Sequence, residues 1–200
     1  MTTGLRERKK AATREALHEA AMRLATENGV EHVTVEAIAD AASVSRRTFS
    51  NYFASKEQAL LHGERARLDH LIELVRARPA AEPPWAALTH AAQAWVAEFA
   101  AEDRHSSARY RRLRRHPSLL AEQVAIYAAA ERELALAMAD RIPAGRHAHA
   151  GIDATLRARL LAANYLNTLR VAAQVWLDHP SRTLPGLVRE ALAVTGEKFH

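Results

Sequence analysis

Alanine dominates the sequence and restricts its fold more than any other feature. The chain of 200 residues contains 44 Ala but only 16 Val and Ile together, with 7 Gly and 7 Pro. Alanine is the best helix former, whereas strands favour β-branched and aromatic residues, and frequent turns need Gly and Pro. These proportions disfavour a sandwich, a barrel or a βαβ sheet. We therefore predict an all-α chain of about nine helices.

Composition also limits the chemistry. Because the chain has no cysteine, it has no disulfide, no thiolate nucleophile and no cysteine-bound metal. The basic residues near Met1 have no apolar stretch behind them, and no apolar run approaches the ~18 residues of a membrane span. We expect a cytoplasmic protein without membrane contact. The net charge of +5 permits an acidic partner without identifying one.

Two short helices separated by a three-residue turn are predicted near the N-terminus. Thr34 is suited to cap a helix over residues 35–42, Ser43-Val44-Ser45 interrupts it, and residues 46–53 form the second helix. This order is typical of the helix-turn-helix motif, whose second helix enters the major groove of DNA. A small shared core supports the pattern, with apolar side chains at Ile38, Val44, Phe49 and Phe53.

The second of these helices has a polar outer face. Arg and Asn side chains suit bidentate contacts with guanine and adenine, and hydroxyl groups suit phosphates. Basic residues also gather in two places, five against one acid in residues 5–14 and three against none in residues 46–56. We therefore predict DNA binding, and a three-helix packing unit with solvated charges is the alternative. The polar face comprises Arg46, Arg47, Thr48, Ser50, Asn51 and Tyr52.

Residues 34–57 resemble the signature of the TetR family of transcriptional regulators. The resemblance extends over about residues 8–61 and rests on five groups at fixed spacing: Ile38-Ala39, Val44-Ser45, Thr48-Phe49, Tyr52-Phe53 and Ser55-Lys56-Glu57. It implies a three-helix DNA-binding domain, expected at residues 1–55, and a larger helical effector-binding and dimerisation domain at residues 56–200. It also implies a homodimer on a palindromic operator, and we expect a repressor that a small-molecule effector releases.

The resemblance assigns roles to individual residues. It implies that Thr34, Tyr52 and Lys56 contact the DNA backbone. The residues expected to read bases are Arg46, Arg47, Thr48 and Asn51, and Ser45 and Ser50 complete the predicted set. Two departures matter: Ser43 stands where the family often has Gly, and Ser50 where it often has Tyr. Serine tolerates a positive φ poorly, so we expect some strain in the turn.

Beyond the break at residues 79–84 the helices lengthen, and no specific motif appears. An aromatic stripe on the next helix is either core or one wall of an effector pocket. Two Asn residues in a later helix rich in Leu and Ala need hydrogen-bond partners if they are buried, and either a ligand or neighbouring backbone can supply them. The candidate pocket residues are Trp85, Trp95, Phe99, Tyr127, Asn164 and Asn167.

The helix expected over residues 153–177 is apolar on two sides. A helix with so wide an apolar arc is expected to be covered twice, once by its own domain and once by a partner. With the last helix it would form a four-helix dimer interface. The candidate interface residues are Leu161, Tyr165, Ala172, Trp176, Leu187, Val188, Ala191 and Leu192.

The remaining features carry weaker signals. Residues 104–116 contain six Arg and no acid. Either these arginines form a solvated basic face, or some of them bridge to the DNA-binding domain by pairing with Glu15 or Glu19. Glu15 with His18 and Glu102 with His105 match the Glu-x-x-His spacing of di-metal helical bundles, so an enzyme is one alternative. A helical adaptor without DNA affinity is another. We expect no catalytic residue, no metal ligand and no cofactor.

Overall fold

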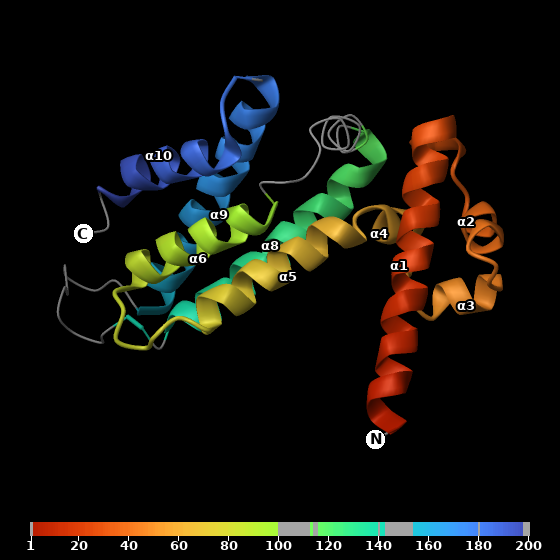
Figure 1. Cartoon of the computed structure of the whole chain (residues 1–200), viewed down its shortest axis with the longest axis horizontal. Helices are drawn as coiled ribbons and strands as arrows, with labels where there is room; N and C mark the ends of the chain where they lie inside the picture. The colour runs from red at the N-terminus through yellow and green to blue at the C-terminus, as the bar shows by residue number, and fades with distance from the viewer. Residues whose placement is uncertain are drawn as a thin grey trace. The chain divides into compact units, whose positions relative to one another are not determined.

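The computed structural model describes residues 2–99, 113, 116–139, 141–142, 154–179 and 181–197, and all regular structure within these ranges is helical (Figure 1). The all-α prediction is confirmed. Contacts divide the chain into two units, Met1–Ala66 with Ala108–Val124, and Arg67–Ser107 with Ala125–His200. None of the described helices is both long and apolar enough to cross a membrane.

The first unit contains most of the short helices. Its elements are α1 (Thr2–Asn28), η1 (Val30–His32), α2 (Val35–Ala41), α3 (Arg46–Ser50) and α4 (Lys56–Leu60). Two helices contribute residues to both units, α5 (His62–Arg76) and, after the short η2 (Pro117–Leu119), α8 (Leu120–Ala139), since a unit boundary falls inside each of them. The second unit adds α6 (Pro84–Phe99), α9 (Ala154–Asp178) and α10 (Leu184–Gly196).

Hydroxyl caps begin the three short helices. Thr34 Oγ1 accepts the Ala37 N–H at 3.1 Å, Ser45 Oγ accepts the Thr48 N–H at 3.0 Å, and Ser55 Oγ accepts the Gln58 N–H at 3.2 Å. Each hydroxyl satisfies an amide that the first helical turn leaves without a partner. The predicted start of α2 after Thr34 is confirmed.

The sequence predicts one continuous helix after Ser55, and the structure divides it at Leu61 into α4 and α5. The cause lies in α1. His18 Nδ1 donates to the Ala59 carbonyl at 2.7 Å, so this side chain competes for the acceptor that a continuous helix uses for its next turn. The adjoining Gly63 packs against the His18 ring, where a β-carbon would lie 2.9 Å from Nε2.

The second unit is built around a junction of α6, α9 and α10. Tyr165 of α9 is fully buried and its hydroxyl donates to the Leu88 carbonyl of α6 at 2.9 Å. The ring of Trp85 meets Tyr165 edge to face with centroids 6.4 Å apart. Gly196 of α10 lies against the indole of Trp85, and a β-carbon there would overlap the ring. Close helix packing therefore depends on the missing side chain.

Two arginines tie α5 to α8. Arg76 Nη2 is 2.7 Å from Glu133 Oε2, and both residues are exposed. Just beyond α8, the Arg141 guanidinium donates to the carbonyls of Pro79 and Arg78, each at 2.6 Å, and of Val75 at 3.3 Å. It thus adds a charged donor to the carbonyls at the end of α5 and in the turn after it, where Val75 and Pro79 also accept backbone N–H groups.

The buried face of α8 differs from the expected one. The sequence pattern places Leu120 and Val124 inward, but they are 62% and 61% exposed, whereas Leu119 and Ile126 are buried. The inward face therefore runs through Leu119, the last residue of η2, and Ile126, not through Leu120 and Val124. Further along, Leu134 and Met138 are buried as the periodicity predicts.

Candidate nucleic-acid interface

The turn between α2 and α3 is tightly closed. The Ser43 N–H donates to the Asp40 carbonyl at 3.0 Å and the Val44 N–H to the Ala39 carbonyl at 2.9 Å. Ser43 has φ of 54°, the positive, left-handed region that glycine occupies without strain. Ser43 therefore has the backbone conformation in which strain is expected for serine.

The α3 face opposite the core is polar and exposed. Phe49 is buried on the inner side, while Arg46, Arg47 and the last residue of the helix, Ser50, are exposed, and so is Asn51 after it. Arg46 forms an ion pair with Glu36 of α2 at 3.0 Å. The Thr48 hydroxyl lies 2.8 Å from Ser45 Oγ, so part of its hydrogen bonding is used within the cap. Arg47 and Asn51 present the side chains best suited to read base edges.

Tyr52 is held against α1. The Arg14 guanidinium lies 5.9 Å from the centroid of the Tyr52 ring, within the range of a cation–π contact. Tyr52 is half-buried, and the contact places a positive charge of α1 beside the end of α3.

The resemblance implies that Lys56 contacts a phosphate of the DNA backbone. In the structure, Lys56 also forms hydrogen bonds within the chain. Its ammonium donates to the carbonyls of Val30 at 3.0 Å and Val33 at 2.8 Å, the latter at the end of η1. An ammonium has three donors, so one remains for another acceptor. Lys56 therefore fixes α4 to the segment that leads into α2, a contact between distant residues that the motif does not predict.

The same segment contacts the residue before η2. His116 Nε2 is 3.5 Å from Glu31 Oε2. The Glu31 backbone N–H, the largest cause, lowers the pKa of the Glu31 carboxyl below its ordinary value, and His32, His116 and Lys56 act in the same direction. His116 also caps η2 by accepting the Ser118 N–H on Nδ1 at 3.4 Å. The six arginines of the predicted bridge at residues 104–116 lie outside the described residues.

The di-metal alternative gains no support from the described residues. Glu15 is exposed on α1, and His18 is committed to the Ala59 carbonyl. Within the described part of the chain, no group of three His, Asp or Glu side chains is placed to hold a metal ion. Glu102 and His105 fall outside those ranges.

The predicted pocket residues are dispersed. Trp85 is buried at the helix junction, and Trp95 donates its indole N–H to the Arg67 carbonyl at 3.0 Å. Asn164 and Asn167 are exposed on α9 and bond within that helix, to the Leu160 carbonyl and to Arg170. Tyr127 is half-buried, and the side chain of Phe99 is outside the described part.

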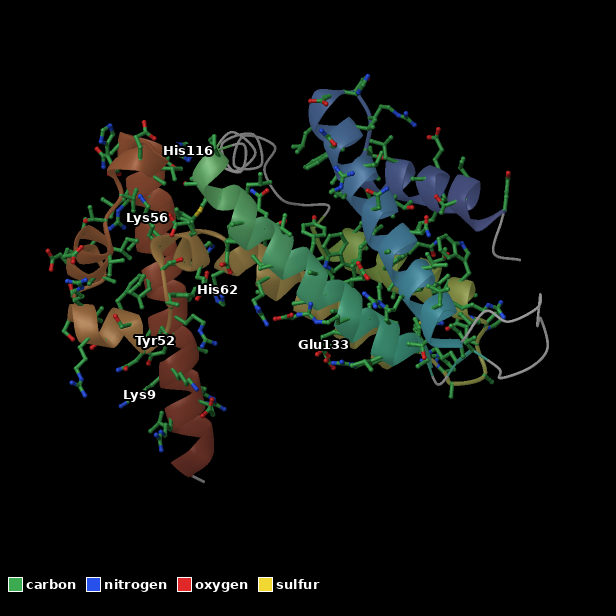
Figure 2. All side chains as sticks on the ribbon, turned by 180° about the vertical axis from the view of Figure 1, so that it is seen from behind. Lys9, Tyr52, Lys56, His62, His116 and Glu133 are labelled. Atoms are coloured by element: carbon green, nitrogen blue, oxygen red, sulfur yellow. The ribbon has the colours of Figure 1, made fainter. Side chains whose placement is uncertain are left out.

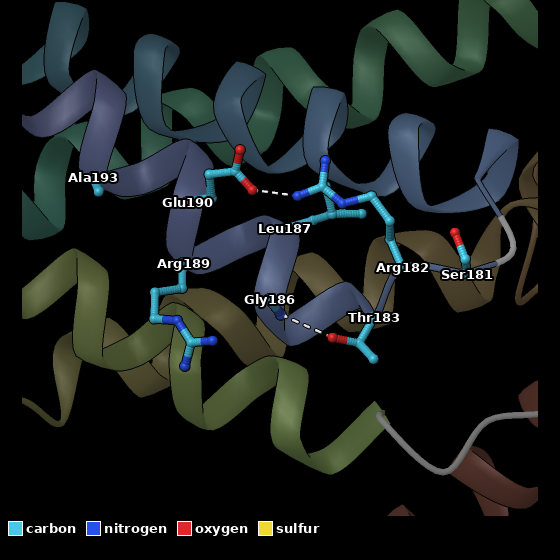
Figure 3. A pocket seen from close by; sticks show the side chains of 8 residues that line it. All are labelled: Ser181, Arg182, Thr183, Gly186, Leu187, Arg189, Glu190 and Ala193. Atoms are coloured by element: carbon cyan, nitrogen blue, oxygen red, sulfur yellow. Dashed lines mark hydrogen bonds and ion pairs between the residues drawn. The ribbon is translucent and has the colours of Figure 1, made fainter.

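A surface depression in the second unit involves none of these pocket candidates. It opens widely to solvent at the start of α10, where Thr183 caps the helix and Arg182 pairs with Glu190 (Figure 3). Its lining is about as polar as it is apolar and includes two arginines, Arg182 and Arg189. It is not the enclosed apolar site expected for an effector.

Most predicted interface residues are used inside the chain itself. Six of them are buried in the described second unit, and Trp176 and Ala191 are half-buried. A side chain without exposed surface cannot contact a partner subunit. The prediction that this side of α9 forms the dimer interface is therefore corrected. The six are Leu161, Tyr165, Ala172, Leu187, Val188 and Leu192. The exposed side of α9 carries Leu156, Leu160 and Val171 instead.

Sequence comparison agrees with this arrangement. Residues 17–62 match the profile of "Bacterial regulatory proteins, tetR family", and residues 82–200 match the "MftR C-terminal domain" profile. The HTH-type transcriptional regulator TcmR of Streptomyces glaucescens is 34% identical over 200 residues, covering 97% of this chain and 84% of TcmR.

Solved structures show the same fold. The Thermus thermophilus repressor FadR, in complex with lauroyl-CoA, is 27% identical with a TM-score of 0.57, over 94% of this chain and 95% of FadR. Bacillus subtilis FadR, in complex with stearoyl-CoA, is 20% identical with a TM-score of 0.58, over 93% and 99% of the two chains. With an exposed polar helix after a closed turn and matches along both halves, the chain belongs to the TetR family of transcriptional regulators.

Proposed function

We propose that this regulator is a repressor that binds a two-fold DNA operator as a homodimer and leaves it when a small molecule binds. The observation that carries the proposal is the α3 surface, where Arg47 and Asn51 are exposed while Phe49 anchors the helix from behind. A regulator of this bacterial family acts where the chromosome is, so we place it in the cytoplasm, and we assign it no enzymatic activity.

Arg47 and Asn51 read bases in this proposal. Arg46 and Ser50 lie on the same exposed face, and Arg46 exchanges its ion pair with Glu36 for a contact with DNA. Thr34, Ser45 and Thr48 sit at helix starts, where hydroxyl and amide groups suit phosphates. Tyr52 and the third donor of Lys56 contact the backbone on the other side of α3.

The effector binds in the second unit. The relative that is 27% identical was solved with lauroyl-CoA, so a ligand with a long apolar part is the first class to test. The half-buried aromatic residues Trp95 and Tyr127 are the side chains best suited to contact such a ligand. The sequence proposes domains at residues 1–55 and 56–200, whereas contacts extend the first unit to Ala66 and add Ala108–Val124 to it.

We place the dimer contact on the exposed side of α9 and on α10. Leu156 and Leu160 are each 48% exposed, Val171 is 41% exposed and Val194 of α10 is 65% exposed. On α9, the exposed positions 156, 160, 164, 167 and 171 recur every three or four residues and so form one stripe along the helix. The stripe consists of three apolar residues and two asparagines, Asn164 and Asn167, and it fits a two-fold contact with its own copy.

Selection of bound fragments from a random-sequence duplex pool tests the DNA proposal. We expect a palindromic consensus, and we expect Arg47→Ala to lose about 1–3 kcal/mol of binding free energy while relaxing preference at one position in each half-site. Arg23→Ala, an exposed arginine on α1, is the matched control. A pool that shows no enrichment, or an Arg47→Ala consensus identical to that of the wild type, contradicts the proposal.

Sedimentation tests the dimer. Leu160→Glu is expected to yield monomers, because it places a charge among the apolar residues of the stripe, whereas Leu136→Glu on the exposed face of α8 is expected to leave the dimer intact. Equal sedimentation of both variants with the wild type would place the contact elsewhere.

A further inference from the structure

The first three turns of α1 have no packing partner among the described residues. All side chains from Gly4 to Ala12 are exposed, while the core-facing residues of the helix begin at Leu17. This stretch precedes the part of the chain that matches the family profile, which starts at residue 17. In proteins most helical stability comes from tertiary packing of one face, so an exposed helical extension of this kind favours a partner.

Basic residues continue the inward face of α1 into this extension. At 100° per residue, Arg6 and Lys10 lie within about 20° of Leu17 around the axis, and Lys9 lies about 80° away. Arg8 lies about 180° away, and Glu7, the one acid of the extension, lies about 80° away on the flank opposite Lys9. The face of α1 that is apolar where it packs against α2 and α4 is therefore positively charged in the exposed extension.

This basic face adjoins α3. Arg14 of the same helix, about 60° from Leu17 on the flank of Glu7, contacts the Tyr52 ring, and α1 extends past α3 toward the N-terminus (Figure 1). Lys9 projects to the side of α1 on which Tyr52 lies (Figure 2). From Arg14 back to Arg6 the helix extends about 12 Å at 1.5 Å per residue, a span over which a duplex presents several phosphates.

Positive charges also oppose the dipole of this helix. The first turn holds no acidic residue, although negative side chains are the ones that stabilise the amino end of a helix. An anionic partner beside the extension removes this repulsion. Charge complementarity, the lack of packing and continuity with the α3 surface thus agree on one occupant.

We propose that the α1 extension is a second DNA-contact surface, on which Arg6, Lys9 and Lys10 bind backbone phosphates adjoining those contacted by Tyr52. The proposal rests on the DNA-binding function proposed above and widens its site. Because phosphate contacts carry no sequence information, the surface contributes affinity and salt dependence and leaves base preference to α3.

The test compares two double variants of the full chain on the selected operator and on a random duplex of equal length. Arg6→Gln with Lys10→Gln removes the proposed contacts, and Arg8→Gln with Arg23→Gln changes the net charge equally on other sides of α1. Gln ranks with Arg and Lys in helix propensity, and circular dichroism checks that the helix content of both variants matches the wild type.

We expect the first variant to make the salt dependence shallower by about 0.9 per lost contact, so by about 1.8 for each protomer. The wild-type-to-variant affinity ratio is then about tenfold larger at 50 mM than at 200 mM salt for each protomer. The loss is the same on operator and random DNA, and the control variant stays near the wild type. Equal salt slopes for the two variants, or a loss confined to the operator, overturn this inference, whereas failure of the wild type to bind DNA overturns the function proposed above.

Discussion

The two units hold their helices by different means. In the first unit, α2, α3 and α4 are 7, 5 and 5 residues long and each begins with a hydroxyl cap. In the second, α6 and α9 are 16 and 25 residues long, and α9 packs many small residues such as Ala158, Ala162 and Ala172. The short helices of the first unit thus add a polar contact at each start to the burial of a few apolar side chains, whereas the long helices of the second unit approach one another closely along their sides.

This difference matches what each unit has to do. Local caps allow the helix-turn-helix to keep its outer face free of packing, so α3 exposes polar side chains on one side only. Close packing makes the second unit sensitive to volume, since tightly packed interiors do not absorb added atoms. Substitutions that change one kind of contact and leave the other unchanged test the distinction.

The largest effect is expected at Gly196. Gly196→Ala places a methyl group against the buried indole of Trp85, so we expect a loss of about 2 kcal/mol in the free energy of unfolding. Denaturant titration measures this loss. Gly4→Ala on α1 is the control, because open space surrounds Gly4; it is expected to stabilise the helix slightly. Equal behaviour of the two variants would refute the dependence on close packing.

A smaller loss is expected at Lys56 in the first unit. Lys56→Met removes two charge-assisted hydrogen bonds to Val30 and Val33, and we expect it to cost about 1.5 kcal/mol of stability. If its third donor also binds phosphate as proposed, the salt slope of DNA binding falls by about 0.9 per protomer.

The two readouts for Lys56 are independent. Unchanged stability would show that the contacts with η1 contribute little, and an unchanged salt slope would remove Lys56 from the DNA contacts. Arg47→Ala is the control, because Arg47 is exposed and forms part of the proposed reading face. It is expected to alter DNA binding without altering the unfolding midpoint.

The smallest effect is expected at the connection between α5 and α6, where stability depends on charge. Glu82 accepts hydrogen bonds from Arg78 at 2.7 Å and also contacts His90. Hydrogen bonding from Arg78, and then from His90, lowers the pKa of the Glu82 carboxyl from 4.5 to about 2. A lowered pKa in the folded state means stability that is present above pH 4.5 and lost as the pH falls toward 2.

Melting temperatures of the wild type and Glu82→Gln across this pH range provide the test. We expect the wild type to be more stable near neutral pH and the difference to shrink steadily below pH 4.5. A difference that stays constant down to pH 2 would show that the Glu82 carboxylate does not stabilise the fold.

The first unit is the more predictable from sequence, for a physical reason. Caps and turns depend on residues a few positions apart. The helix cap at Thr34 and the turn at Ser43 can therefore be predicted from the residues next to them. The hydrogen bond from Lys56 to Val30 joins residues 26 positions apart in the sequence, and the one from His18 to Ala59 joins residues 41 positions apart. Neither leaves a local signal, and the second of them divides α4 from α5.

In the second unit periodicity identifies helices but not their neighbours. Both sides of α9 carry apolar residues, and an Ala-rich helix gives no indication of which side meets its own chain. The sequence prediction placed Tyr165 on the outer side, whereas its hydroxyl bonds with Leu88, 77 residues earlier. Asn164 and Asn167 were pocket candidates because of their polarity, and their exposure explains that polarity more simply.

The contact between Trp85 and Gly196 also has a consequence in time. On the ribosome, α6 emerges before the helix that covers its tryptophan, and about 110 residues separate the two. At about 5–20 residues per second, synthesis leaves the indole without this cover for roughly 5–20 seconds. During that interval the indole of Trp85, which is buried in the folded protein, can contact chaperones and other nascent chains. We expect the yield of folded protein to depend on chaperone capacity more strongly than its final stability suggests.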